Sequence, residues 1–73
     1  MSATYREIRA CSELSPGERV EAWRDGTLIH RGKVLAVVPA LELFWIDDAR
    51  TGMRQLLDLD QLRILQCPLH AVA

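Results

Sequence analysis

The stretch that decides the fold is Gly17-Glu18-Arg19-Val20-Glu21-Ala22-Trp23-Arg24-Asp25-Gly26. Polar and apolar residues alternate from Glu18 to Trp23, which is the period of a strand with one buried face. This alternation predicts that Val20 and Ala22 point into the core and that Trp23 points outward. Because Asp-Gly is a strong signal for a two-residue hairpin turn, a second antiparallel strand is expected directly after Gly26.

Four further strands follow from the residues downstream, over 28–38, 41–46, 53–57 and 63–66. Gly32 lies in the middle of the first of these, where a glycine indicates a bulge or a tight bend. Pro39 ends that strand, and residues 58–62 resemble a single helical turn before the last strand. Five short strands with one kinked by glycine predict a mainly β fold, a small barrel that closes by bending.

Residues 1–16 are expected to form an N-terminal arm or a short helix, ahead of a barrel over 17–66 and a tail over 67–73. Thr4 and Glu7 have capping-box spacing, and three apolar side chains share one side of a helical wheel: Tyr5, Ile8 and Leu14. A leading strand or a loose tail is the alternative, because chain ends are often poorly ordered.

The composition describes one globular domain: 73 residues, 49% hydrophobic and 26% charged. A formal net charge of −1 disfavours a general nucleic-acid coat protein, which needs a basic excess over the phosphates. No signal peptide and no membrane-spanning run is expected, so we predict a cytoplasmic protein with no membrane partner.

The segment 17–26, together with Arg31-Gly32-Lys33-Val34, resembles the opening of Tudor, Agenet and KOW-type domains. Phe44-Trp45-Ile46-Asp47-Asp48 and Leu57-Asp58-Leu59-Asp60-Gln61-Leu62 are similar to later segments of Tudor domains. The likeness covers about two-thirds of the chain. It implies a five-stranded SH3-like barrel.

Tudor domains use an aromatic cage that attracts methylated Lys or Arg through the faces of its rings. Carried over residue by residue, the resemblance assigns such a cage to Trp23, His30, Trp45 and Asp48. The alternative for both tryptophans is that they cover a thin core. KOW-type relatives imply binding of RNA, ribosomal components or RNA polymerase instead.

Several arginines, Arg24 and Arg31 among them, would form a basic stripe if strand pairing aligned them. Beside Trp23 such a stripe suits single-stranded nucleic acid, because aromatic rings stack on bases while arginines hold phosphates. An ordinary surface of mixed charge is the alternative reading, since acidic residues lie among the arginines.

Metal and catalytic chemistry find little support. Cys11, Cys67 and His70 offer three zinc ligands where a structural site needs four, and incidental thiols and a tail imidazole are expected instead. No nucleophile elbow and no phosphate-binding glycine loop is present. The enzymatic alternative is an oligomer with a pore site, by fold analogy with the trimethoprim-resistant dihydrofolate reductases.

The sequence therefore predicts a non-enzymatic binding or adaptor module without a cofactor or metal. Its expected partner is another protein or a second copy of itself. The expected binding residues are Trp23, Arg24, His30, Arg31, Trp45 and Asp48. An RNA- or single-strand-binding module is the alternative.

Overall fold

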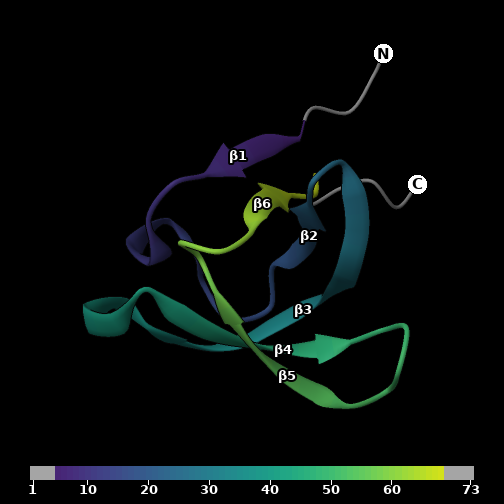
Figure 1. Cartoon of the computed structure of the whole chain (residues 1–73). Coiled ribbons are helices and arrows are strands. Elements are labelled where there is room, and N and C mark those ends of the chain that lie inside the picture. Colours follow the sequence, from purple (N-terminus) through teal and green to yellow (C-terminus); the bar gives the residue numbers. More distant parts are fainter. Residues whose placement is uncertain (1–4, 69–73) are drawn as a thin grey trace.

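A computed structural model describes residues 5–68 as one six-stranded antiparallel sheet with the strand order β1-β6-β2-β3-β4-β5 (Figure 1). The strands are β1 (Arg6–Ile8), β2 (Arg19–Arg24), β3 (Thr27–Val38), β4 (Leu43–Asp48), β5 (Arg54–Asp58) and β6 (Arg63–Gln66). The mainly β class is confirmed, with six strands in place of the five expected. The pairings leave β1 and β5 as the two edges of the sheet.

The hairpin between β2 and β3 turns at Asp25 and Gly26, as predicted. Both residues have positive φ angles, 51° and 77°. Two consecutive positive φ values are the signature of a type I′ turn, whose twist matches that of the flanking strands. Val20 and Ala22 are fully buried on the inner face of β2, which confirms the alternation.

Strand β3 is long and curved, and it pairs with β2 through its first half and with β4 through its second (Figure 1). Its pairing register slips by one residue at Ile29 and again at Leu35. Gly32 lies between these two slips and pairs in register on both sides, with Val20 and with Asp48. A Cβ built on Gly32 would overlap the carbonyl oxygen of Asp47, so the strands approach too closely there for any side chain.

The helix expected near the N-terminus is not found in the described part of the chain. Arg6–Ile8 instead pairs with β6 as strand β1, and Cys11–Glu13 forms a three-residue 3₁₀ turn, η1. Ile8 and Leu14 are buried, but Tyr5 is exposed, so the three do not form one apolar face. The expected capping residue Thr4 lies outside the described residues. No helix within residues 5–68 has the length and apolar character needed to cross a membrane.

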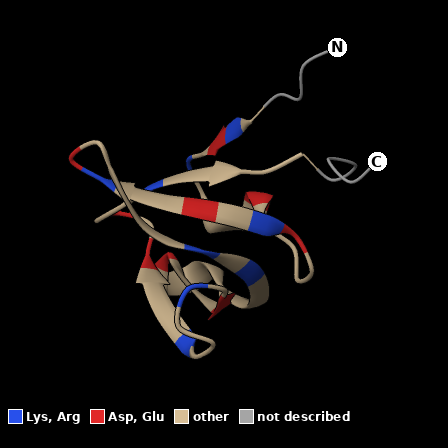
Figure 2. Cartoon of the chain, turned by 90° about the vertical axis from the view of Figure 1, so that its right-hand side faces the viewer, with Lys and Arg blue, Asp and Glu red and all other residues tan. Residues whose placement is uncertain are grey.

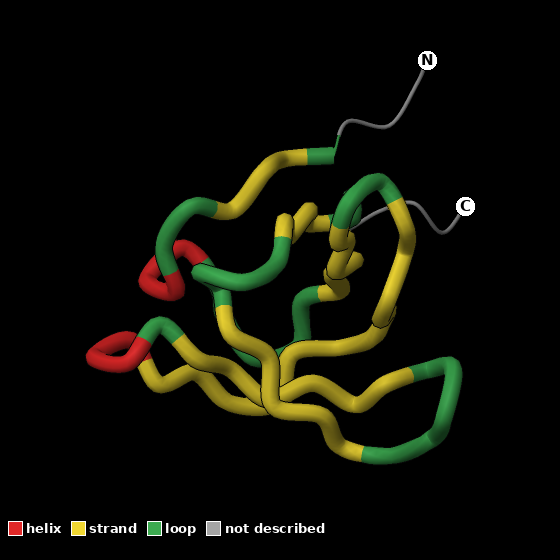
Figure 3. Tube along the Cα trace, viewed as in Figure 1, coloured by secondary structure: helices red, strands yellow, loops and turns green. Residues whose placement is uncertain are grey.

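Two further boundaries differ from the prediction. The segment Pro39–Leu41 forms a second 3₁₀ turn, η2, so β4 begins at Leu43 and not at Leu41. Residues 58–62 form a turn closed by the Gln61 N–H, which donates to the Asp58 carbonyl at 3.1 Å, and no helix is assigned there. Figure 3 shows η1 and η2 at the same end of the molecule, where the Cys11 N–H donates to Oε1 of Glu42 at 3.0 Å.

The core lies on the concave side of the sheet and is closed at one end by the N-terminal segment. Every long strand contributes inward-facing residues, and the N-terminal segment adds Ile8, Cys11 and Leu14. The buried apolar residues are Ile8, Cys11, Leu14, Val20, Ala22, Val34, Phe44, Ile46, Leu57, Leu59 and Ile64. The N-terminal segment is part of the folded unit, because three of its residues are buried in the core. This contribution matters in a chain so short that its core is marginal.

Candidate functional site

One polar pair, a half-buried histidine and a buried aspartate, connects the inner faces of β3 and β4. Nδ1 of His30 lies 2.8 Å from Oδ2 of Asp48, whose side chain is only 1% exposed. The inward direction of both side chains follows from the register, because His30 pairs with buried Ala22 and Asp48 pairs with Gly32. A buried carboxylate is stable only with hydrogen-bond partners, and this one is fully partnered.

Asp48 also organises the loop that joins β4 to β5. Its Oδ1 accepts from the Arg50 N–H at 2.8 Å, and its backbone carbonyl accepts from the Gly52 N–H at 2.7 Å. Burial on its own would raise the pKa of Asp48. The hydrogen bonds from His30 and from the Arg50 N–H outweigh burial and hold the pKa below its ordinary value. The ionised carboxylate therefore links β3 and β4 to the loop between β4 and β5.

The four residues of the expected cage do not line one pocket in the described part of the chain. His30 and Asp48 bind each other on the inner side of the sheet, while Trp23 and Trp45 border two separate surface pockets. A cation held by ring faces needs those faces to converge within about 6 Å of it. These four side chains do not provide that arrangement.

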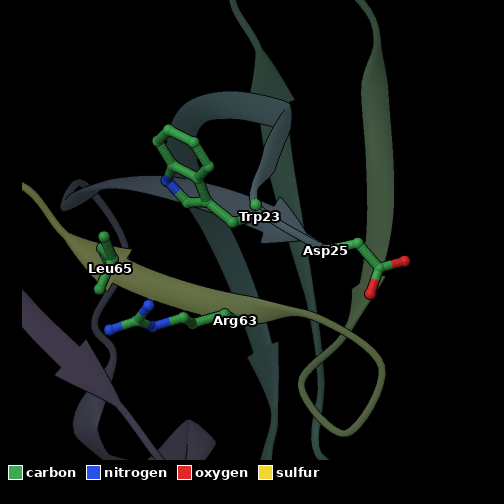
Figure 4. A pocket seen from close by; sticks show the side chains of 5 residues that line it. Trp23, Asp25, Arg63 and Leu65 are labelled. Carbon is green, nitrogen blue, oxygen red and sulfur yellow. The ribbon is translucent and has the colours of Figure 1, made fainter.

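Trp23 borders a pocket of about 320 Å³ on the outer side of β2 and β6, together with Asp25, Gly26, Arg63 and Leu65. In Figure 4 the indole lies above β6, the Arg63 side chain runs along β6 towards Leu65, and the Asp25 carboxylate points away from all three. The indole N–H donates to Oε1 of Glu21 at 3.1 Å, which orients the ring. Trp23 is half-buried, so it contributes both to packing and to an open surface.

Trp45 lies on the outer face of β4 and is 38% exposed. Its register neighbours are Ala36 on β3 and Leu56 on β5, and the slip in β3 places Leu35 beside them. These four residues form what we call the Trp45 face: Leu35, Ala36, Trp45 and Leu56. The alternative that Trp45 covers the core does not hold, because Phe44 and Ile46 are the inward residues of β4.

The Trp45 face was missed from the sequence except for its tryptophan. The alternation of β4 indicates a two-faced strand, but it does not say which face is covered. Leu56 and Leu35 join Trp45 only through pairing across strands. The direction of the Leu35 side chain also depends on a slip in register. The residues around Leu35 give no sign of this slip.

Basic and acidic residues are interspersed along the ribbon, and no single basic region stands out (Figure 2). Arg24 is exposed at the end of β2, opposite Thr27. Arg31 lies opposite Glu21 and borders a third pocket with Arg19 and Arg50. Arg24 and Arg31 therefore lie on different parts of the surface. Arg31 is close to other arginines, and Arg24 is not one of the residues that line that pocket.

The two cysteines are free thiols in different surroundings. Cys11 is fully buried, and burial, aided by the nearby carboxylate of Glu42, raises the pKa of its thiol to about 11. Cys67 is half-buried directly after β6, and His70 lies outside the described residues. Over residues 5–68, no group of three or more His, Cys, Asp or Glu side chains is placed to hold a metal ion.

Comparisons of the chain with family models, with curated proteins and with solved structures find no match. The class that the structure defines is a small all-β protein built on one antiparallel sheet.

Proposed function

We propose that this chain is a small, cytoplasmic, non-enzymatic protein-interaction module with an SH3-like barrel, and that it associates with a second copy of itself through the Trp45 face. The barrel is supported by the curvature of β3, by its two register slips and by the close approach of Gly32 to the backbone of Asp47. Such irregularities bend a sheet around its own core.

The observation that carries the proposal is the exposed apolar row across three strands. Ala36, Trp45 and Leu56 are consecutive cross-strand neighbours on the outer face, and Leu35 is 39% and Leu56 46% exposed. A contiguous apolar patch rimmed by polar residues marks an interaction surface, and tryptophan is enriched at the centre of such surfaces. On one side the rim is the charged row of Lys33, Asp47 and Arg54.

A second copy is the occupant that the charges of this face suit. Along β5, the outward residues are Arg54, Leu56 and Asp58, so opposite charges lie on either side of an apolar centre. A two-fold axis along the row through Leu56 and Trp45 lays β5 antiparallel on the partner's β5. Arg54 of one copy then meets Asp58 of the other, twice, which is the self-complementarity that a two-fold interface requires.

Charge reversal tests this arrangement. Arg54→Glu and Asp58→Lys, each alone, place like charges in contact across the two-fold axis, so each variant is expected to be monomeric in sedimentation equilibrium. An equimolar mixture restores both opposite-charge contacts and is expected to form a heterodimer. Since Asp58 also accepts a hydrogen bond from the Asp60 N–H, Asp58→Asn serves as the control that keeps a turn acceptor without the charge.

The two tryptophans provide a matched control. Trp45→Ser is expected to abolish self-association, whereas Trp23→Ser, on a separate pocket, leaves it intact. A wild-type chain that stays monomeric at about 1 mM, where even weak specific contacts are populated, contradicts the proposal. So does a dimer that survives Trp45→Ser, which would point to pairing through the edge strand β5.

A further inference from the structure

A basic pocket of about 340 Å³ lies on the outer side of β2 and β3, away from the Trp45 face. It is lined by five parts of the chain: the residue before β1, strand β2, strand β3, the loop after β4, and the residue after β6. Its lining residues are Tyr5, Arg19, Glu21, Arg31, Gly32, Ala49, Arg50 and Cys67. Its size lies within the range of pockets that hold small molecules.

Three guanidinium groups meet one carboxylate in this pocket, a net charge of +2 (three minus one), although the whole chain carries −1. Within residues 5–68, Arg19, Arg31 and Arg50 take part in no ion pair. Arg19 even pairs in register with Lys33. Like charges gathered in this way repel one another, so a bound anion would stabilise the pocket.

Arg50 is held in place before any ligand arrives. Its Nη1 donates to the carbonyl oxygens of Leu28 and Ile29, at 3.0 and 3.1 Å, and its backbone N–H donates to buried Asp48. Its Nε and Nη2 make no hydrogen bond within residues 5–68, so these donors can serve a ligand. A donor fixed in advance loses less entropy on binding, and the arginine fork matches the geometry of phosphate oxygens.

The uncharged lining residues indicate what else the ligand carries. Ala49 contributes only a methyl group to the lining, which keeps the space open. Tyr5 is 48% exposed at the rim, where its ring is available for stacking on a planar group. Glu21 has one oxygen on the Trp23 indole, and the other is available to accept from a hydroxyl group.

From these features we propose that the pocket binds a nucleotide, with its phosphate on Arg19, Arg31 and Arg50 and its base against Tyr5. The phosphate supplies the missing negative charge, the base uses the exposed ring, and a ribose hydroxyl suits the acceptor on Glu21. This site is independent of the self-association proposed above, because it shares no residue with the Trp45 face.

Isothermal titration of the full chain with inorganic phosphate, adenosine 5′-monophosphate and adenosine separates these contributions. We expect the monophosphate to bind best, phosphate alone more weakly, and adenosine least. Arg31→Gln is expected to weaken monophosphate binding by about tenfold or more, since it removes a charge-assisted hydrogen bond. Arg24→Gln, an exposed arginine on the same strand as Arg19 but outside the pocket, is expected to change it less than about twofold.

Tyr5→Leu tests the stacking part of the proposal. It is expected to weaken the monophosphate towards the affinity of phosphate alone and to leave phosphate binding unchanged. The proposal is overturned if none of the three compounds binds, if adenosine binds as well as its monophosphate, or if Arg24→Gln weakens binding as much as Arg31→Gln. The last result would indicate diffuse attraction by the surface. If phosphate and monophosphate bind equally, an adventitious ion site is all that the pocket provides.

Discussion

Nδ1 of His30 and Oδ2 of Asp48 lie 2.8 Å apart across the inner face of β3 and β4, at a carboxylate that solvent barely reaches. The same carboxylate accepts from the Arg50 N–H, so one buried group joins two strands to the loop that enters the basic pocket. His30 and Asp48, two of the four residues expected to form an aromatic cage, therefore support the loop that carries Arg50.

Removing the Asp48 carboxylate should destabilise the fold strongly. Asp48→Ala leaves the His30 ring and the Arg50 N–H without their acceptor, and we expect the free energy of unfolding to fall by about 3 kcal/mol. Urea denaturation followed by tryptophan fluorescence measures this loss. Asp47→Ala, its exposed neighbour on β4, is the matched control and should cost less than about 1 kcal/mol. Equal losses for the two variants would contradict the role assigned to Asp48.

Acid should remove the contribution of Asp48 in a defined order. The folded-state pKa of Asp48 is lower than its ordinary value of 3.8. The unfolded state therefore binds the proton first, so this stabilisation is complete above pH 3.8 and is lost as pH falls through the folded pKa. The urea midpoint of the wild type should drop more steeply below that pH than the midpoint of Asp48→Asn. Parallel curves for the two proteins would show that Asp48 is not responsible.

Alkali acts on Cys11 in the opposite direction. Its folded pKa of about 11 exceeds the ordinary 9.0, so between these values the unfolded thiol ionises while the folded one keeps its proton. Stability should therefore decline from pH 9 towards pH 11, and the decline should be smaller in Cys11→Ala. Urea titrations at several alkaline pH values measure the difference. An identical decline in both proteins would assign it to other groups.

Thiol labelling distinguishes the two cysteines near neutral pH. Cys11 is buried in the core, so the reagent reaches it only when the chain unfolds. Its raised pKa also keeps the folded thiol protonated, and the thiolate is the form that reacts with iodoacetamide. Cys67 is half-buried and should be modified first. Mass spectrometry of a partly labelled sample reports the order. Rapid modification of Cys11 in the native protein would contradict its place in the core.

Gly32 should tolerate no side chain. In Gly32→Ala the new Cβ would overlap the Asp47 carbonyl oxygen and lie 2.8 Å from its carbon, so the strands must separate. We expect a loss of about 3 kcal/mol, or no folding at all. Gly17→Ala is the control, since its φ of 97° carries strain but nothing lies within 4 Å of the added Cβ. That variant should lose about 1 kcal/mol. If Gly17→Ala proves the more damaging change, the close approach at Gly32 is not limiting.

Local pattern was enough where one residue type settles the backbone. The Asp25-Gly26 turn, the alternation through Val20 and Ala22, and the end of β3 before Pro39 were all predicted correctly. Period, turn chemistry and a missing N–H act over a few residues, so they can be read without knowing the fold. The N-terminal helix failed because propensity in 1–14 was outweighed by the free edge of β6, with which Arg6–Ile8 pairs.

The candidate site shows the limit of such reasoning. Trp23 and Trp45 were identified as surface candidates from residue type, but their separation into two pockets follows from strand order and register. His30 and Asp48 are 18 residues apart in the sequence. They meet only because β3 and β4 pair and place both side chains on the inner face of the sheet. The basic pocket around Arg19, Arg31 and Arg50 is likewise assembled from distant segments.

By itself, the sequence determined a small mainly β chain, most of its strands, its hairpin turn and the residues of its β2 core, because these depend on side-chain period and on backbone conformation near one residue. Only the tertiary structure decided which side chains share a surface. Cross-strand register sets that, and a slip of one residue, as at Leu35, redirects a side chain without leaving a mark in the local pattern. The hairpin turn at Asp25 and Gly26 was predictable because it depends on local backbone conformation. The separation of Trp23 and Trp45 from His30 and Asp48 was not, because it depends on cross-strand register.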